Sequence, residues 1–160
     1  GRTGKMWAFE HFDVAPDIMT TAKGLGSGMP VAAVVSDKAH MDKWAPGSHG
    51  GTYGGNAVAT SAVVATLEVM RDEDLPANSA RMGEILMSGL REIQADHPVI
   101  GDVRGMGLMV ATEFVKSDGS PNPEAVKRVV ESAFKDKTLL ITCGTQDQGI
   151  RIVPPLVVNE

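Results

Sequence analysis

Two glycine-rich loops place the strongest limit on what this chain can fold into. Three glycines follow Lys23 within five residues, and four more lie between Ser48 and Asn56. Each loop borders a short apolar run of the kind that forms a strand or a helix. Because the 18 glycines of this 160-residue chain gather in loops, they favour an α/β chain that carries a site in its loops over a helical bundle.

The bulk composition excludes several classes of protein. With 42% hydrophobic and 22% charged residues, the chain can form one packed domain or two small ones. A net charge of -5 argues against nucleic acid or an anionic membrane as a partner. The single cysteine, Cys143, excludes an internal disulfide and fits a reducing compartment, which indicates the cytoplasm. No apolar run is long enough to span a bilayer, and no signal segment opens the chain.

The N-terminal half is expected to frame the first loop with strands. Residues 17–20 and 31–36 read as short buried strands on either side of Lys23. Asn56 suits the N-cap of a helix over 57–71. That helix is apolar nearly all round, so it is expected to be well buried. If neighbouring strands are missing, however, the apolar residues over 31–35 and 57–70 would be exposed.

The half that follows residue 75 reads as a compact α+β unit. The expected elements are helices over 76–95 and 123–135, and strands over 108–115, 139–142 and 150–153. Residues 100–107 read as a turn-rich entry to the first of these strands, and 143–149 as a turn. The first helix has an amphipathic face formed by Met82, Ile85, Leu86, Leu90 and Ile93.

Lys23 has two interpretations. Most lysines are solvated surface residues, and this one stands at the mouth of a flexible loop. Alternatively, its amine is a reagent, because it follows a strand and its neighbours are small enough to leave room for a ligand. A lysine in such a pocket can attack a carbonyl and form an imine.

The second loop, Gly50-Gly-Thr-Tyr-Gly-Gly-Asn56, offers backbone amides and one hydroxyl just before a helix start. This combination suits a phosphate monoester, although a purely structural turn is the alternative. An amine loop and a phosphate loop about 30 residues apart indicate a phosphorylated aldehyde bound as an imine, and pyridoxal phosphate is the usual one. The glycines match neither dinucleotide nor P-loop patterns, so a nucleotide module is the weaker alternative.

The other polar candidates carry less information. Arg151 alternates with apolar neighbours, so it is either a carboxylate clamp or an arginine on a solvated sheet face. Arg104 is expected to fix a turn by bonding carbonyls or a carboxylate. The four histidines lack ligand spacing, so no metal site is indicated, and a structural role is expected for His49. Cys143 is interpreted as a small buried residue.

Several segments together resemble one family, the class III (ω-amino acid) aminotransferases. They are Gly1-Arg-Thr-Gly-Lys5, Pro16–Gly26 around Lys23, His49–Asn56, Val103–Leu108 and Ile150–Leu156. The resemblance follows the family's order through the whole chain. The stretch Leu140–Thr145 with Ile150-Arg151 is most similar to the 4-aminobutyrate aminotransferase branch. The family implies the α/β fold of aspartate aminotransferase, which is fold type I of the pyridoxal-phosphate enzymes.

The resemblance also implies roles. Lys23 would bind the cofactor as an imine and shuttle the substrate proton. Gly51 and Thr52 would bind the cofactor phosphate of the neighbouring subunit in a homodimer, and Arg151 would hold a substrate carboxylate. Residues 1–75 would belong to the large cofactor domain and residues 76–160 to an incomplete small domain.

The chain is expected to be a C-terminal fragment of such an enzyme. It starts without methionine and stops in an extended apolar segment, and the family's aspartate for the pyridine nitrogen is not among its residues. We therefore expect the piece alone to be inactive, although its parent transfers amino groups between ω-amino acids and 2-oxo acids. An aminomutase or decarboxylase of the same fold, and a non-catalytic truncated relative, remain alternatives.

Overall fold

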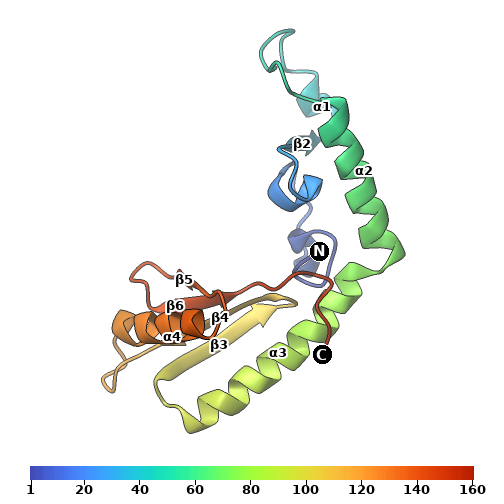
Figure 1. Ribbon diagram of the computed structural model, residues 1–160. Helices are drawn as coiled ribbons and strands as arrows, with labels where there is room; N and C mark the ends of the chain where they lie inside the picture. The colour runs from blue at the N-terminus through green and yellow to red at the C-terminus, as the bar shows by residue number, and fades with distance from the viewer. The chain divides into compact units, whose positions relative to one another are not determined.

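The computed structural model describes all 160 residues of the chain, which form two compact units (Figure 1). The N-terminal unit comprises Phe9–Asp74. The C-terminal unit comprises Leu75–Glu160 together with Gly1–Ala8. The assignment of residues 1–75 and 76–160 to two domains of a longer enzyme stays a prediction.

The N-terminal unit contains a two-stranded antiparallel sheet. Strand β1 (Ile18–Thr21) pairs with β2 (Ala33–Ser36), and Thr21 lies opposite Ala33. The connection holds a 3-10 turn, η2 (Lys23–Gly26), while η1 (Ala8–His11) and the four-residue helix α1 (Lys38–Met41) are also short. Both strands were predicted, but the expectation that they are buried is wrong: Ile18 and Val35 are half-exposed. Two strands of four residues have no second layer within the unit to cover them.

Helix α2 (Ala57–Asp72) follows the second glycine-rich loop. Its N-cap is Asn56, as predicted, and the Asn56 Oδ1 accepts a 3.0 Å hydrogen bond from the Ala59 amide. The predicted burial of this helix is wrong, because only Ala59 is buried. The exposed apolar side chains are Val58, Val64, Leu67 and Val69. They confirm the expected exposure over 57–70, since the main element that α2 packs against is the short η2 turn, where Thr66 Oγ1 donates to Ser27 Oγ.

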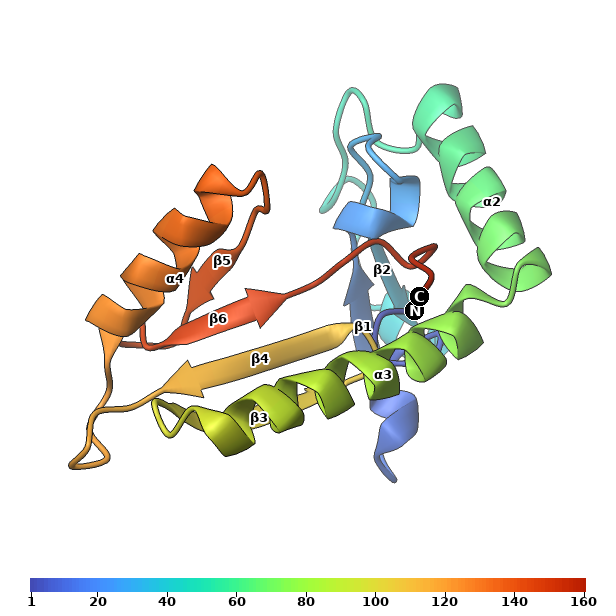
Figure 2. The same cartoon turned by 60° about the horizontal axis from the view of Figure 1, so that its bottom comes forward.

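The C-terminal unit is a four-stranded antiparallel sheet with two helices. The strand order is β3-β4-β6-β5, formed by Ile100–Met106, Met109–Phe114, Gly149–Ile152 and Ile141–Cys143. Helix α3 (Leu75–Asp96) runs along β3 and β4 (Figure 2), and helix α4 (Pro123–Lys135) packs on β4, β5 and β6. Both helices contribute to one core, made by Ile100, Val103, Phe114, Ala125, Val126 and Ile150 with Leu90 at its side.

Most predicted elements of this unit are confirmed. Helix α4 has the predicted bounds, α3 differs by one residue at each end, and 144–148 form the turn between β5 and β6. Strand β3 was missed, because its glycines were interpreted as a turn. A Cβ at Gly105 would lie 2.5 Å from the Met109 carbonyl oxygen. The close approach of β4 to β3 at this point therefore requires a glycine.

The buried face of α3 differs from the predicted one. Met82 is buried as expected, but Ile85 and Ile93 are half-exposed, and Ser79, Gly83 and Met87 are buried instead. A Cβ at Gly83 would lie 2.1 Å from the Gly107 carbonyl oxygen. The helix therefore approaches the β3–β4 turn through a glycine, and this rotation directs Ile85 and Ile93 outward.

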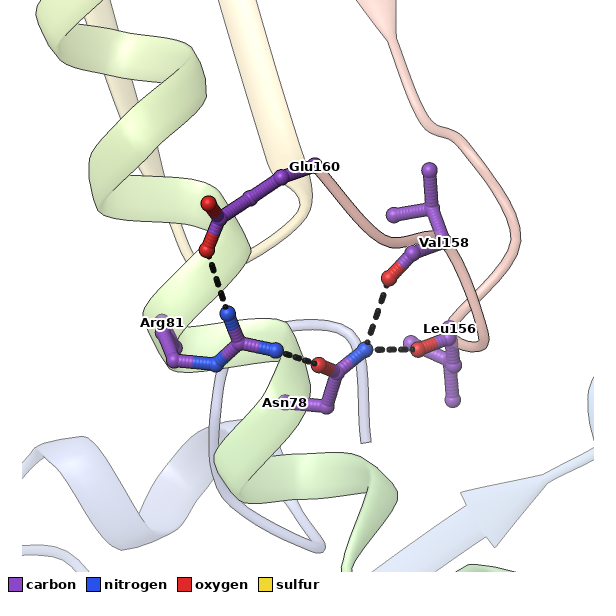
Figure 3. A network of polar contacts seen from close by, with 5 residues as sticks. All are labelled: Asn78, Arg81, Leu156, Val158 and Glu160. Carbon is purple, nitrogen blue, oxygen red and sulfur yellow. Dashed lines mark hydrogen bonds and ion pairs between the residues drawn. The ribbon is translucent and has the colours of Figure 1, made fainter.

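Helix α3 also binds the C-terminal segment (Figure 3). The Asn78 side-chain amide donates to the carbonyls of Leu156 and Val158 at 2.7 and 3.0 Å. Arg81 donates to Glu160 and to the Asn78 side-chain oxygen. Extended chain after β6 is thereby tied to the first turns of α3. None of the helices combines the length and the apolar character that a membrane crossing requires.

Candidate active site

Lys23 lies two residues after the end of β1 and opens the η2 turn. Its backbone has a φ of 53°, in the left-handed region that non-glycine residues rarely occupy. Such a conformation costs free energy and persists where the surroundings require it, often at functional sites. The side chain is exposed, so the amine is accessible.

A cavity of about 520 Å³ lies beside this lysine. Its lining is made of small and aliphatic residues with one amine and one imidazole: Thr20, Thr21, Ala22, Lys23, Ala32, Ala33, Val34 and His49. The volume is within the range of small-molecule sites, about 300–1,000 Å³. Strand β1 and the start of β2 contribute to its walls, and Lys23 supplies the one amine among the lining side chains. The arrangement suits a small molecule with a carbonyl group.

His49 is a cavity residue that sequence reasoning did not place there. Its ring packs edge-on against Trp44, with ring centroids 5.3 Å apart, and the residue shares the cavity with Lys23. The available signal was its position directly before the Gly-Gly-Thr loop. The Trp44 contact agrees with the expected structural role, and His49 also lines the cavity beside Lys23.

The Gly-Gly-Thr loop is open and rich in free amides. The Gly54 amide donates to the Gly51 carbonyl at 3.1 Å and closes a turn, whereas the amides of Gly50, Gly51 and Thr52 donate to no group of the chain. Thr52 is exposed, and a Cβ at Gly51 would meet nothing within 4 Å. Unused amides and a hydroxyl before a helix are the donors that a phosphate needs. Thr52 does not line the Lys23 cavity.

Arg151 lies on the open face of the C-terminal sheet, in one row with a second arginine. The register places Arg104 opposite Ala111, and Ala111 opposite Arg151. Side chains directly opposite each other in a sheet share a face. Arg104 and Arg151 therefore project from the same face, which is the one away from the core residues Val103 and Ile150.

The two arginines differ in their partners. The Arg104 guanidinium donates to Glu113 and Asp102, and these hydrogen bonds, with that of Glu113 the stronger cause, raise its pKa. Arg104 thus bonds carboxylates as expected, but within strand β3 instead of a turn. Arg151 is exposed and forms no ion pair within the chain. Its fork of donors is free for a carboxylate from outside the chain.

The remaining candidates add no chemistry. Cys143 is free and half-buried, not buried as expected, because β5 is an edge strand. No group of three or more His, Cys, Asp or Glu side chains could hold a metal ion. Lys23, Gly51 and Thr52 belong to the N-terminal unit, and Arg151 belongs to the C-terminal unit.

Known proteins resemble this chain along its whole length. A 5-aminovalerate aminotransferase of Pseudomonas putida is 45% identical over 161 residues, which cover 100% of this chain and 38% of that protein. A 4-aminobutyrate aminotransferase of Escherichia coli is 38% identical, again over 100% of this chain and 38% of the relative. The crystal structure of a transaminase from a marine Virgibacillus superposes with a TM-score of 0.90 at 32% identity, covering 100% of this chain and 39% of that one.

These likenesses agree with the fold and with the family. The chain spans about 38% of the length of the curated relatives that it matches. The superposition confirms the α/β fold of the pyridoxal-phosphate-dependent aminotransferases, of which the two units are a part. The sequence model for aminotransferase class-III matches residues 1–160. The chain therefore belongs to the class-III aminotransferase family.

Proposed function

We propose that the protein containing this chain transfers the amino group of an ω-amino acid, such as 4-aminobutyrate, to a 2-oxo acid. The observation that carries the proposal is the whole-chain match to the class-III family together with a lysine that lines a cavity of ligand size. The relatives named above act on 5-aminovalerate and 4-aminobutyrate, which are both ω-amino acids.

Pyridoxal phosphate is the proposed cofactor, and the residues present fit it. Class-III aminotransferases depend on this cofactor, which supplies an aldehyde for the amine and a ring that accepts electrons from the substrate carbon. The fit rests on the Lys23 amine beside a cavity of about 520 Å³ and on the free amides of Gly50, Gly51 and Thr52. Lys23 Nζ would hold the aldehyde and later take and return the proton of the substrate carbon.

Gly51 and Thr52 would bind the phosphate of the cofactor held by the neighbouring subunit of a homodimer. Supporting this, the loop is exposed, its amides are unused, and Thr52 does not line the cavity of its own Lys23. A phosphate would accept hydrogen bonds from the Thr52 hydroxyl and from the preceding amides. The site would then be complete only in the dimer.

Arg151 would bind the carboxylate of the amino acid or 2-oxo acid. Its guanidinium has no carboxylate partner in the chain, whereas that of Arg104 in the same row has two. A bidentate contact would hold the carboxylate of the substrate in one orientation.

We further assign Lys23 and Thr52 to the large domain of the longer enzyme, over 1–75, and Arg151 to its small domain, over 76–160. We propose that this enzyme is cytoplasmic. We also propose that the isolated chain is inactive.

The test uses the full-length protein with pyridoxal phosphate. We expect glutamate to form from 2-oxoglutarate when 4-aminobutyrate or 5-aminovalerate is added. Release of carbon dioxide would favour a decarboxylase, and isomerisation of an amino acid without a 2-oxo acid would favour an aminomutase. No reaction, with no pyridoxal phosphate bound, would favour a non-catalytic relative or, if ATP or NAD stabilises the protein, a nucleotide module.

A further inference from the structure

Arg2 binds the chain directly after the strand that carries Arg151. Its Nη1 donates to the carbonyl oxygens of Pro154 and Val153, at 2.8 and 3.2 Å. Strand β6 ends at Ile152, so these carbonyls are the first two that the sheet does not hold. Arg2 is half-buried and forms no ion pair. The charged guanidinium donates to backbone oxygens instead. These contacts are strong, because hydrogen bonds from a charged donor are stronger than those between neutral groups.

The backbone of Arg2 is fixed on its other side by helix α3 and the β3–β4 turn. The Arg2 carbonyl oxygen accepts hydrogen bonds from the Ser79 hydroxyl at 2.5 Å and from the Leu108 amide at 2.8 Å. The Leu108 amide also reaches Ser79 Oγ, at 3.1 Å. Ser79 is fully buried and Leu108 nearly so. One residue thus connects α3, the β3–β4 turn and the exit of β6.

Glycine packing leaves this connection little freedom. Gly107 has a φ of 53°, and a Cβ there would lie 2.4 Å from the Arg2 carbonyl oxygen and 2.8 Å from Ser79 Oγ. A Cβ at Gly83 would meet the backbone of Gly107. Any side chain at either position would push the Arg2 segment away from the sheet. Arg2 is therefore held in one place, which a positioning residue requires.

We propose that Arg2 is a positioning residue for Arg151: by holding the Val153 and Pro154 carbonyls it fixes the end of β6, and with it the direction of the Arg151 guanidinium. This inference rests on the proposed carboxylate-binding role of Arg151. Arg151 pairs with Ala111 and Ile141, but the sheet contributes no side chain that bonds its guanidinium. The direction of the Arg151 side chain therefore depends on the position of its backbone. The backbone directly after Ile152 is held by the hydrogen bonds from Arg2. Small displacements of a binding group are costly, because bidentate contacts depend on angle and distance.

The test uses the full-length enzyme loaded with pyridoxal phosphate. Binding of glutarate, an unreactive dicarboxylate, is measured by calorimetry, and KM and kcat are measured with 2-oxoglutarate. We expect Arg2→Ala to weaken glutarate binding and raise KM by about tenfold, the size expected for the loss of two hydrogen bonds that orient the site. The affinity for pyridoxal phosphate and kcat should stay within about twofold. Arg2→Lys, which keeps the charge and one donor, should give an intermediate loss and covers the case in which Arg2→Ala does not fold.

Arg81→Ala is the matched control. Arg81 is also an arginine of the C-terminal unit that binds the C-terminal segment, but its contacts are with Glu160 and Asn78. We expect this variant to bind glutarate as the unchanged protein does. Equal losses from Arg81→Ala and Arg2→Ala would show a general loosening of the segment and would overturn the proposal.

A double-mutant cycle with Arg151→Gln isolates the coupling. If Arg2 acts through Arg151, Arg2→Ala should have no further effect on glutarate binding in the Arg151→Gln background. Additive losses, or no loss from Arg2→Ala and Arg2→Lys, would overturn the inference while leaving the role of Arg151 intact. If Arg151→Gln itself leaves glutarate binding unchanged, the proposed function of Arg151 fails and the inference fails with it.

Discussion

The two units of this chain use similar apolar content in different ways. In the C-terminal unit, a sheet and two amphipathic helices close a core in which Val126, Val110 and Ile150 are at most 2% exposed. In the N-terminal unit, α2 buries only Ala59, and Val58 is 66% exposed. Amphipathic elements can thus pack against partners within one segment of chain, whereas elements that are apolar on all sides need layers that this segment does not supply.

The chemistry divides along the same line. Lys23 and Thr52, the proposed cofactor ligands, belong to the N-terminal unit, which has little buried core. Arg151, the proposed substrate ligand, belongs to the C-terminal unit, which closes a core of its own. A catalytic group is expected to control turnover, and a substrate clamp to control affinity. Variants in the two units should therefore fail in different ways.

The largest expected effect follows the loss of the reactive amine. Lys23→Ala in the full-length enzyme should lower kcat by about 10³-fold, since it removes both the nucleophile and the proton carrier. Steady-state assays with 4-aminobutyrate and 2-oxoglutarate measure it. Lys38→Ala is the control, because Lys38 is an exposed lysine of the same unit that pairs with Asp42. Equal losses in both variants would contradict the role of Lys23.

Hydrogen exchange on the isolated 160-residue chain tests the difference in packing. Amides of β3, β4 and β6 should exchange at least ~10²-fold more slowly than those of β1 and β2, because opening the first group requires disruption of a core. Mass spectrometry of peptides from the two units measures both sets in one sample. Similar protection in the two sheets would contradict the difference in packing between the two units.

Two valines, one in each unit, measure the difference in packing as a free energy. Val126→Ala on α4 should lower the free energy of unfolding of the isolated chain by about 2 kcal/mol, since Val126 is 1% exposed in the core. Val64→Ala on α2 should change it by less than about 0.5 kcal/mol, since Val64 is 56% exposed and alanine favours helix. Urea titrations of both variants give the numbers. A larger loss from Val64→Ala would contradict the packing described for α2.

The smallest effect concerns a loop charge in the C-terminal unit. The hydroxyl and the amide of Ser120 both donate to the Asp118 carboxylate, and these bonds lower its pKa. A carboxyl with a lowered folded-state pKa adds stability above its unfolded-state pKa, and this contribution is lost as the pH falls through the folded-state pKa. An NMR titration should show Asp118 below its ordinary pKa, and Ser120→Ala should raise it. An unchanged titration in the variant would contradict the assignment.

The sequence predicted the helices and strands better than their burial and their contacts with neighbouring elements. Helix α4 could be predicted to the residue, because Asn122-Pro123 marks its start and Val126 and Val130 recur on one face. Strand β3 could not be predicted, because Gly101 and Gly105 are required where Val115 and strand β4 approach the chain closely. The rotation of α3 toward Gly107 and the exposure of α2 likewise depend on neighbours distant in sequence.

The site shows the same limit. The motif around Lys23 indicated an amine at a strand end, and the structure adds the left-handed backbone, the cavity and His49. Arg151 could be placed on one strand face, but its contrast with Arg104 required the sheet register. Arg2 lies about 150 residues from its carbonyl partners in the chain, so no local pattern could reveal that contact.

Reduction of the full-length protein with borohydride tests whether Lys23 is the residue that binds pyridoxal phosphate. The protein is loaded with pyridoxal phosphate, reduced, digested and mapped by mass spectrometry. We expect a pyridoxyl group on Lys23 and none on Lys38 or Lys43 of the same unit. A pyridoxyl group on another lysine, or no modification of a protein that is folded and exposed to the cofactor, would contradict it.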